Sequence, residues 1–318
     1  YMPSSGKLNP DHPDIVHDLE NPTQPRSLPG LILAAIIRRR ERNLPPFSVM
    51  SCDNMPENGH VTRNVITQLA ERHSHDLADY IQTHITFPST MVDRIVPAMT
   101  DAAFDALEAR LGSSDPVAVE AEPFFQWVIE DNFVNGRPAW ENAGAELVSD
   151  VLPFEEMKLR MLNGSHSFLA YLGFLAGYEH ISDCMADANF RTAARALMLQ
   201  DQAPTLRTQG VDLEAYADSL IARYENRAIK HRTYQIATDG TQKLPQRLLD
   251  SVRWHLRNGT SCDYLMLGVA AWMRYVSGVD EQSQAIEIRD PLKEQLASIV
   301  AHSDEGAQRV EALLRLQA

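Results

Sequence analysis

The sequence predicts an α/β part followed by a mostly α-helical C-terminal part, with a boundary near residue 150. Up to that point, helical segments alternate with short apolar segments that end at polar residues, which is typical of α/β folds. Beyond it, apolar residues recur with helical spacing and no strand-like alternation interrupts them. The 318 residues are 44% hydrophobic and 23% charged, a globular composition with room for one large domain or two ordinary ones.

The first part opens with residues 9–29, which are rich in proline and aspartate and are expected to form an irregular connection. A helix is expected over 31–42, because an apolar run is followed there by basic residues that complement the helix dipole. Residues 47–52 form a short apolar segment of strand type that leads to the polar Asn54. Another helix is expected over 59–72.

Two further segments of strand type follow, at 85–94 and 124–129, and each leads to polar residues. Ligands of open α/β sheets bind at the carboxyl ends of strands, so Asn54 and Asp93 are expected at a binding site. In the second part, helical periodicity predicts three long helical regions, at 154–203, 212–227 and 244–276.

Charge and cysteine content exclude several classes of protein. Forty-three acidic residues against 29 basic ones give a formal net charge of −14, which disfavours nucleic-acid binding. The longest apolar run, residues 31–37, is far shorter than a membrane span. The three cysteines are scattered and show no CxxC spacing, which predicts free thiols and a cytoplasmic location. No third ligand stands beside His73 and His75, so no metal site is predicted there.

The densest group of reactive residues runs from Lys158 through Asn163 to His166. On an α-helix, Asn163 and His166 would lie about 140° and 80° round from Lys158, so all three would share one side. A lysine of lowered pKa can exchange a proton with a carbonyl or alcohol oxygen. The amide can donate to a developing alkoxide, and the histidine can orient a hydroxyl.

Spacing alone leaves a structural alternative open, because a helical lysine is usually solvated and a lone histidine often belongs to the core. Candidate site residues elsewhere in the chain favour the catalytic interpretation. Asn54 and Asp93 are expected at strand ends, and a later turn at 239–245 supplies Lys243, which could reach an anionic or hydroxylated substrate.

Four strings in the sequence are recognisable, at residues 51–54, 87–97, 122–131 and 158–166. Taken together, they resemble the polyol-specific long-chain dehydrogenase/reductase family, which includes mannitol 2-dehydrogenases and fructuronate reductases. Their order along the chain is that of the family, and the resemblance extends over the whole sequence. Within the family, the fructuronate reductases are most similar, through residues 129–138, 163–173 and 231–247.

The resemblance implies a role for each matching residue. Lys158 matches the catalytic acid/base, Asn54 and Asn163 match the amides that hold the reacting oxygen, and His166 matches the residue that positions the substrate. Asp93 matches an aspartate at the junction of nicotinamide and substrate, so Asn54 and Asp93 are also implied as cofactor contacts. Lys243 matches a contact to the distal end of the substrate. The implied reaction is metal-free, reversible reduction of D-fructuronate to D-mannonate with NAD, NADP not being excluded.

The chain departs from the polyol-specific pattern at Gln235, where those enzymes carry a basic residue. Three nearby cations, Arg232, Lys243 and Arg247, could pair with a hexuronate carboxylate, for which arginine is geometrically suited. The sequence does not choose among them.

A second departure is that the 318 residues contain no G-x-G-x-x-G, the glycine-rich turn of the family's nucleotide-binding domain. The resemblance therefore implies an incomplete Rossmann-like dinucleotide-binding domain at 1–150 and a helical substrate domain at 151–318. Such a chain is expected to bind NAD weakly or not at all, and to show no turnover alone.

Two other functions stay open from the sequence. A mannitol or other polyol 2-dehydrogenase would share the reaction but act on a neutral substrate. A non-catalytic helical module would instead use the face that carries Lys158 to bind another protein. For the leading interpretation the partner is a small hexuronate or polyol, with neither nucleic acid nor membrane involved; the sequence does not indicate an oligomeric state.

Overall fold

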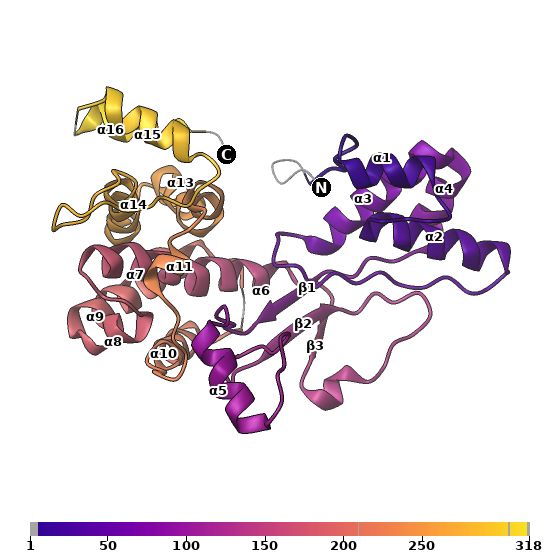
Figure 1. Cartoon of the computed structure of the whole chain (residues 1–318), viewed down its shortest axis with the longest axis horizontal. Helices are drawn as coiled ribbons and strands as arrows, with labels where there is room; N and C mark the ends of the chain where they lie inside the picture. The colour runs from indigo at the N-terminus through magenta and orange to yellow at the C-terminus, as the bar shows by residue number, and fades with distance from the viewer. Residues whose placement is uncertain (1–5, 209, 305, 317–318) are drawn as a thin grey trace. The chain divides into compact units, whose positions relative to one another are not determined.

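The computed structural model describes residues 6–208, 210–304 and 306–316. The chain forms two compact units that interleave in sequence. The first unit comprises Tyr1–Asp93 and Phe125–Glu155, and the second comprises Arg94–Phe124 and Glu156–Ala318. The elements of both are labelled in Figure 1.

Four helices begin the first unit: α1 (Pro13–Glu20), α2 (Leu28–Glu41), α3 (Asn58–His73) and α4 (His75–His84). The helices predicted at 31–42 and 59–72 correspond to α2 and α3. The irregular connection predicted at 9–29 is wrong over α1, whose proline occupies the first helical position, where its missing N–H costs no hydrogen bond. Ser27 and Ser74 cap α2 and α4, because each hydroxyl accepts a hydrogen bond from a first-turn N–H.

Asp18 fixes the turn between α1 and α2. Its carboxylate accepts hydrogen bonds from the N–H groups of Arg26 and Ser27 and from the Ser27 hydroxyl. Burial alone would raise the pKa of Asp18, but these hydrogen bonds lower it to about 2. A Cβ on Gly30 would overlap this carboxylate, so the close approach requires glycine.

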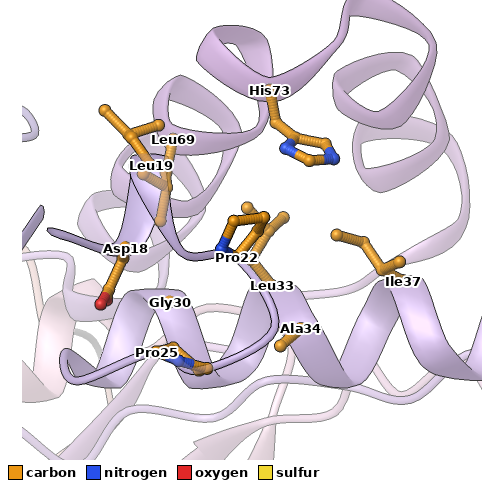
Figure 2. A pocket seen from close by; sticks show the side chains of 10 residues that line it. All are labelled: Asp18, Leu19, Pro22, Pro25, Gly30, Leu33, Ala34, Ile37, Leu69 and His73. Carbon is orange, nitrogen blue, oxygen red and sulfur yellow. The ribbon is translucent and has the colours of Figure 1, made fainter. Parts of the chain in front are cut away.

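A cavity of about 10 Å³ lies beside Asp18, between α1, α2 and α3, and Figure 2 shows the side chains around it. This volume is near the minimum for one water molecule. The cavity is therefore a small gap in the packing of the first unit rather than a site for a substrate. Its lining comprises Asp18, Leu19, Pro22, Pro25, Gly30, Leu33, Ala34, Ile37, Leu69 and His73.

A three-stranded sheet completes the first unit, in the order β1 (Thr90–Asp93), β2 (Gln126–Glu130), β3 (Glu146–Val148). Strands β1 and β2 are antiparallel, with Thr90 opposite Ile129, whereas β2 and β3 are parallel. The strand-type segment at 85–94 contains β1, and the segment at 124–129 contains β2 except for its last residue, Glu130. The prediction for 47–52 is wrong, since that segment is extended but is not a strand; one backbone hydrogen bond, from Val49 N–H to the Thr86 carbonyl (2.9 Å), attaches it.

The second unit is helical, and no strand occurs after Val148 in the part of the chain that the structure describes, which confirms the predicted change of architecture. None of the helices described is both long enough and apolar enough to cross a bilayer. The helical elements are α5 (Asp101–Leu111), α6 (Leu152–Met157, which spans the division), η2 (Lys158–Asn163), α7 (Gly164–Leu175), α8 (Ile181–Ala186), α9 (Ala188–Ala196), η3 (Leu197–Gln202), η4 (Ala203–Thr205), α10 (Leu213–Tyr224), α11 (Thr233–Ile236), α12 (Gly240–Leu244), η5 (Pro245–Leu249), α13 (Asp250–Asn258), α14 (Asp263–Tyr275), α15 (Lys293–His302) and α16 (Ala307–Leu314).

Helix α7 is the centre of this unit. It packs against α8, α9, α11 and α14 (Figure 1), and ten of its twelve residues are buried, as expected of a helix that is apolar on every side. Gly173 allows the approach of α8, since a Cβ there would overlap the Cys184 thiol. Gly177 lies in open space with φ +85°, just beyond the helix, where its role is to end α7.

An ion pair attaches the segment Arg94–Phe124 to the second unit. Arg223 donates to both carboxylate oxygens of Glu122, at 2.7 and 3.0 Å, and both side chains are almost fully buried. The same carboxylate accepts from Ile95 N–H at 2.6 Å, so one glutamate joins both ends of the segment to α10. Arg223 also lies over the Phe124 ring, 4.0 Å from its centroid.

Candidate functional site

Lys158 and Asn163 are the first and last residues of a π-helix, η2, that continues from α6 and leads into α7. The sequence analysis assumed an α-helix, and that assumption is wrong here. Hydrogen bonds of a π-helix join residues five apart, so Lys158 and Asn163 stand one above the other on the same face. The angle between the two side chains around the helix axis is therefore smaller in the π-helix than the 140° expected for an α-helix.

All three residues of the predicted group are buried: Lys158 is 8% exposed, Asn163 is 7% exposed and His166 is 6% exposed. A buried lysine is unusual, which argues against the solvated alternative. The Asn163 amide nitrogen has no hydrogen-bond partner among the described residues. A buried NH₂ group without an acceptor costs free energy, and an oxygen of a bound ligand would satisfy it.

His166 lies between two aromatic rings, with the Tyr224 ring centroid at 4.5 Å and that of His231 at 5.2 Å. Burial holds the pKa of His166 well below its usual value, and nearby His231, Arg247 and Arg223 lower it further. The ring is therefore uncharged at neutral pH. A neutral imidazole has one donor and one acceptor nitrogen, which suits contact with a sugar hydroxyl.

Lys243, on α12, already has partners. Its ammonium donates to the carbonyl of Thr238 at 2.8 Å and to the hydroxyl of Thr238 at 3.1 Å, and lies 3.5 Å from the Asp239 carboxylate. Burial lowers the pKa of Lys243, and the neighbouring Arg247 lowers it further. Lys243 is thus a held, half-buried cation rather than a mobile surface lysine.

Arg247, on η5, has few partners. Its guanidinium donates to the Ser167 hydroxyl at 3.1 Å, and its Nε has no hydrogen-bond partner among the described residues. Burial lowers the pKa of Arg247 to about 10. Gly164 lets η5 approach this closely, since a Cβ there would lie 2.9 Å from the Arg247 carbonyl oxygen.

Sequence reasoning assigned no role to His231, which the structure places edge-on to His166. Its Nδ1 is buried and has no hydrogen-bond partner in the described residues, and burial, aided by Lys243, lowers its pKa to about 4. The residue lies in the string 231–247, which carried the family resemblance. A histidine there has no distinctive spacing, so only the fold could identify it.

Arg232 lies at the surface of the second unit. Its side chain is 55% exposed and lies 3.7 Å from the exposed Glu179 carboxylate. Five of the other residues considered above, together with His231, are buried or partly buried in the same unit. These five are Lys158, Asn163, His166, Lys243 and Arg247.

Asn54 and Asp93 belong to the first unit. Asp93 is buried at the end of β1, and Asn54 is exposed and follows the extended segment 47–52. Buried Asn58 joins the two regions, because its amide group bonds the Asp53 carbonyl and both the N–H and carbonyl of Thr90. That Asn54 and Asp93 act together with Lys158 stays a prediction.

Two family models match the chain: one described as the mannitol dehydrogenase Rossmann domain at residues 4–142, and one described as the mannitol dehydrogenase C-terminal domain at residues 150–318. Among curated relatives, an uncharacterized oxidoreductase of Escherichia coli (strain K12), YdfI, is 61% identical over the entire chain and 65% of its own length. The D-mannonate oxidoreductase of the same organism is 57% identical over 98% of the chain and 64% of its own length.

Among solved structures, a Pseudomonas fluorescens mannitol 2-dehydrogenase in ternary complex with NAD and D-mannitol matches with a TM-score of 0.84 and 41% identity. The match covers 98% of the chain and 63% of that protein. The chain therefore spans just under two thirds of the length of the proteins that it matches.

Proposed function

Since the chain belongs to the mannitol dehydrogenase family, we propose that it acts in an NAD-dependent oxidoreductase that interconverts a ketone and a secondary alcohol of a sugar acid. The proposed reaction is the reversible reduction of D-fructuronate at its C5 carbonyl to give D-mannonate. The 57% identity to a D-mannonate oxidoreductase supports this substrate. The observation that carries the chemistry is the buried pair Lys158 and Asn163 on one face of a π-helix.

In the reducing direction, Lys158 gives its proton to the keto oxygen as negative charge develops there. The unpartnered amide nitrogen of Asn163 donates a hydrogen bond to the same oxygen, and Asn54 supplies a second amide. Neutral His166 hydrogen-bonds a substrate hydroxyl next to the reacting carbon, which holds the substrate in one orientation. In the oxidising direction, the same lysine accepts the proton from the alcohol.

The nicotinamide of NAD, when bound, supplies or accepts the hydride. Asp93 is proposed to lie beside that ring because it matches the family's aspartate at the junction of nicotinamide and substrate, and it is buried at the end of β1. Asn54 would be the second residue to contact the nicotinamide. The pyrophosphate contacts are not assigned, since the sequence has no glycine-rich turn of the G-x-G-x-x-G type.

A substrate panel tests this function on the protein expressed from its complete reading frame. D-fructuronate, D-tagaturonate and D-fructose would be reduced with NADH and NADPH, and D-mannonate and D-mannitol would be oxidised. We expect D-fructuronate with NADH to give the highest kcat/KM. A preference for D-fructose would indicate a mannitol 2-dehydrogenase and contradict the proposed substrate.

Lys158→Met tests the acid/base role. We expect kcat/KM to fall about 10²- to 10⁴-fold, the range typical of a general acid. Lys230→Met is the matched control, because Lys230 is exposed, and it should leave kcat/KM unchanged. Intact turnover in Lys158→Met, with loss of binding to another protein, would indicate a non-catalytic module instead.

A further inference from the structure

One cation in the group around His166 is not neutralised by the protein. In the described part of the chain no carboxylate pairs with the Arg247 guanidinium, and its one hydrogen-bond partner is the neutral Ser167 hydroxyl. The side chain of Arg223, by contrast, is buried and donates to both carboxylate oxygens of Glu122. The Arg247 side chain is partly exposed, but its Nε is fully buried. An unpaired charge held this close to the interior is costly to a folded protein, so its presence requires an explanation.

A second polar atom in the group around His166 is also unsatisfied. His231 Nδ1 has no partner in the same set of residues, and the His231 ring meets His166 edge-on, with ring centroids 5.2 Å apart and an interplanar angle of 82°. Arg247 reaches the same turn of α7, because its guanidinium donates to Ser167, the residue next to His166, and its charge lowers the pKa of His166. Because the His231 ring is uncharged at neutral pH, it can donate through Nδ1 without adding to the positive charge.

We propose that Arg247 and His231 bind the carboxylate of the substrate and thereby make the site specific for hexuronates over neutral polyols. This inference rests on the proposed function. It assigns Arg247 and His231 to the carboxylate end of the substrate, which is remote from the carbonyl that Lys158 protonates. A guanidinium presents parallel N–H groups that match the two oxygens of a carboxylate. A bound carboxylate would satisfy Arg247 Nε and His231 Nδ1 and neutralise the buried charge at once.

The other two basic candidates are less suited. Arg232 is exposed and close to Glu179, so a carboxylate there would compete with water and with an existing partner. The Lys243 ammonium already donates to Thr238 and lies near Asp239.

The test compares D-fructuronate and D-fructose as substrates of the complete enzyme and three variants. Arg247→Met removes the charge and keeps the length of the side chain, and Arg247→Lys keeps the charge but not the paired N–H groups. Arg253→Met is the control, because Arg253 is exposed on α13 and pairs with the exposed Asp250. In Arg247→Met we expect kcat/KM for D-fructuronate to fall about 100-fold, through KM, with D-fructose changed by less than about threefold.

Arg247→Lys should retain more activity on D-fructuronate than Arg247→Met. His231→Gln should lower kcat/KM for D-fructuronate about tenfold, the effect of one lost hydrogen bond to a charged group. Equal losses on D-fructuronate and D-fructose in Arg247→Met would overturn the inference. A wild-type enzyme that reduces D-fructose but not D-fructuronate would instead overturn the proposed function.

Thermal unfolding gives a readout that does not depend on turnover. D-mannonate should raise the Tm of the wild-type enzyme and D-mannitol should not, and the increase should vanish in Arg247→Met. Without ligand, Arg247→Met should be at least as stable as wild type, because an unpaired buried charge has been removed. A variant that loses stability without ligand, or that D-mannonate still stabilises fully, would contradict the assignment.

Discussion

At the residue scale, two buried imidazoles link the stability of the second unit to pH. The pKa of His231 is lowered to about 4 and that of His166 lies well below 6.5, in both cases mainly because the rings are buried. Between pH 4 and 6.5 the unfolded chain therefore binds more protons than the folded protein, and stability falls as the pH falls through this window. For His231 alone the loss amounts to about 3 kcal/mol once the pH is below 4.

His231→Gln should reduce this acid sensitivity. We expect the difference in unfolding free energy between pH 7 and pH 4 to be smaller in the variant than in wild type, measured by urea unfolding at each pH. His302→Gln, which changes an exposed histidine at the end of α15, should leave that difference unchanged. An identical pH profile for His231→Gln and wild type would contradict the prediction.

At the element scale, the π-helix η2 sets the direction of Lys158. Inserting one alanine after Leu159 should place Lys158 and Asn163 six residues apart, which turns Lys158 by about 100° relative to Asn163. We expect at least a 100-fold loss of kcat with little change in helix content by circular dichroism. Leu159→Ala is the control, since it shortens the side chain but keeps the number of residues. Unchanged kcat in the insertion variant would show that the spacing set by the π-helix has no part in the chemistry.

The contact between α7 and α8 offers a test of packing at the same scale. Gly173→Ala should destabilise the protein by about 1–3 kcal/mol, because the new methyl group overlaps the Cys184 thiol. Cys184→Ala makes room for that methyl group, so the double variant should be more stable than the sum of the single changes implies. Chemical unfolding of the four proteins measures the coupling, and strictly additive effects would contradict this contact.

Local patterns predicted some elements and not others. Helices α2 and α3 follow from apolar spacing and from basic or capping residues next to them, all of which are local signals. Helix α1 was missed because its proline and aspartates also favour loops. The π-helix was missed as well, since the spacing of its apolar residues does not distinguish it from an α-helix, and the unmet hydrogen bonds of Asn163 and His231 arise only from tertiary packing.

At the scale of the whole molecule, each unit has its own hydrophobic core. Ile81 is fully buried in the core of the first unit, and Leu169 in that of the second. Separate cores favour separate unfolding steps. Calorimetry should therefore resolve two transitions, with Ile81→Ala lowering the Tm of one and Leu169→Ala that of the other, at a cost of about 2–5 kcal/mol each. A single transition that both variants lower equally would contradict this expectation.

The order of a Rossmann-type part before a helical part was predictable from the sequence, and the family models agree with it. The placement of Arg94–Phe124 with the second unit was not. It depends on the pair between Glu122 and Arg223, which are 101 residues apart, and no local pattern contains such a contact. The candidate site likewise was only partly predictable from local patterns. Spacing identified Lys158 and Asn163, whereas choosing Arg247 over Arg232 required knowing how exposed each side chain is in the fold.

The path of the chain between the two units constrains how genes of this kind can recombine. The polypeptide leaves one unit for the other after Asp93, again after Phe124 and again after Glu155. A single crossover within the stretch that encodes these 318 residues would therefore give a chimera in which at least one unit mixes segments from both parents. Hybrids between relatives of different substrate preference should keep both units intact only when crossovers fall at all three junctions, so that Glu122 and Arg223 are inherited from the same parent.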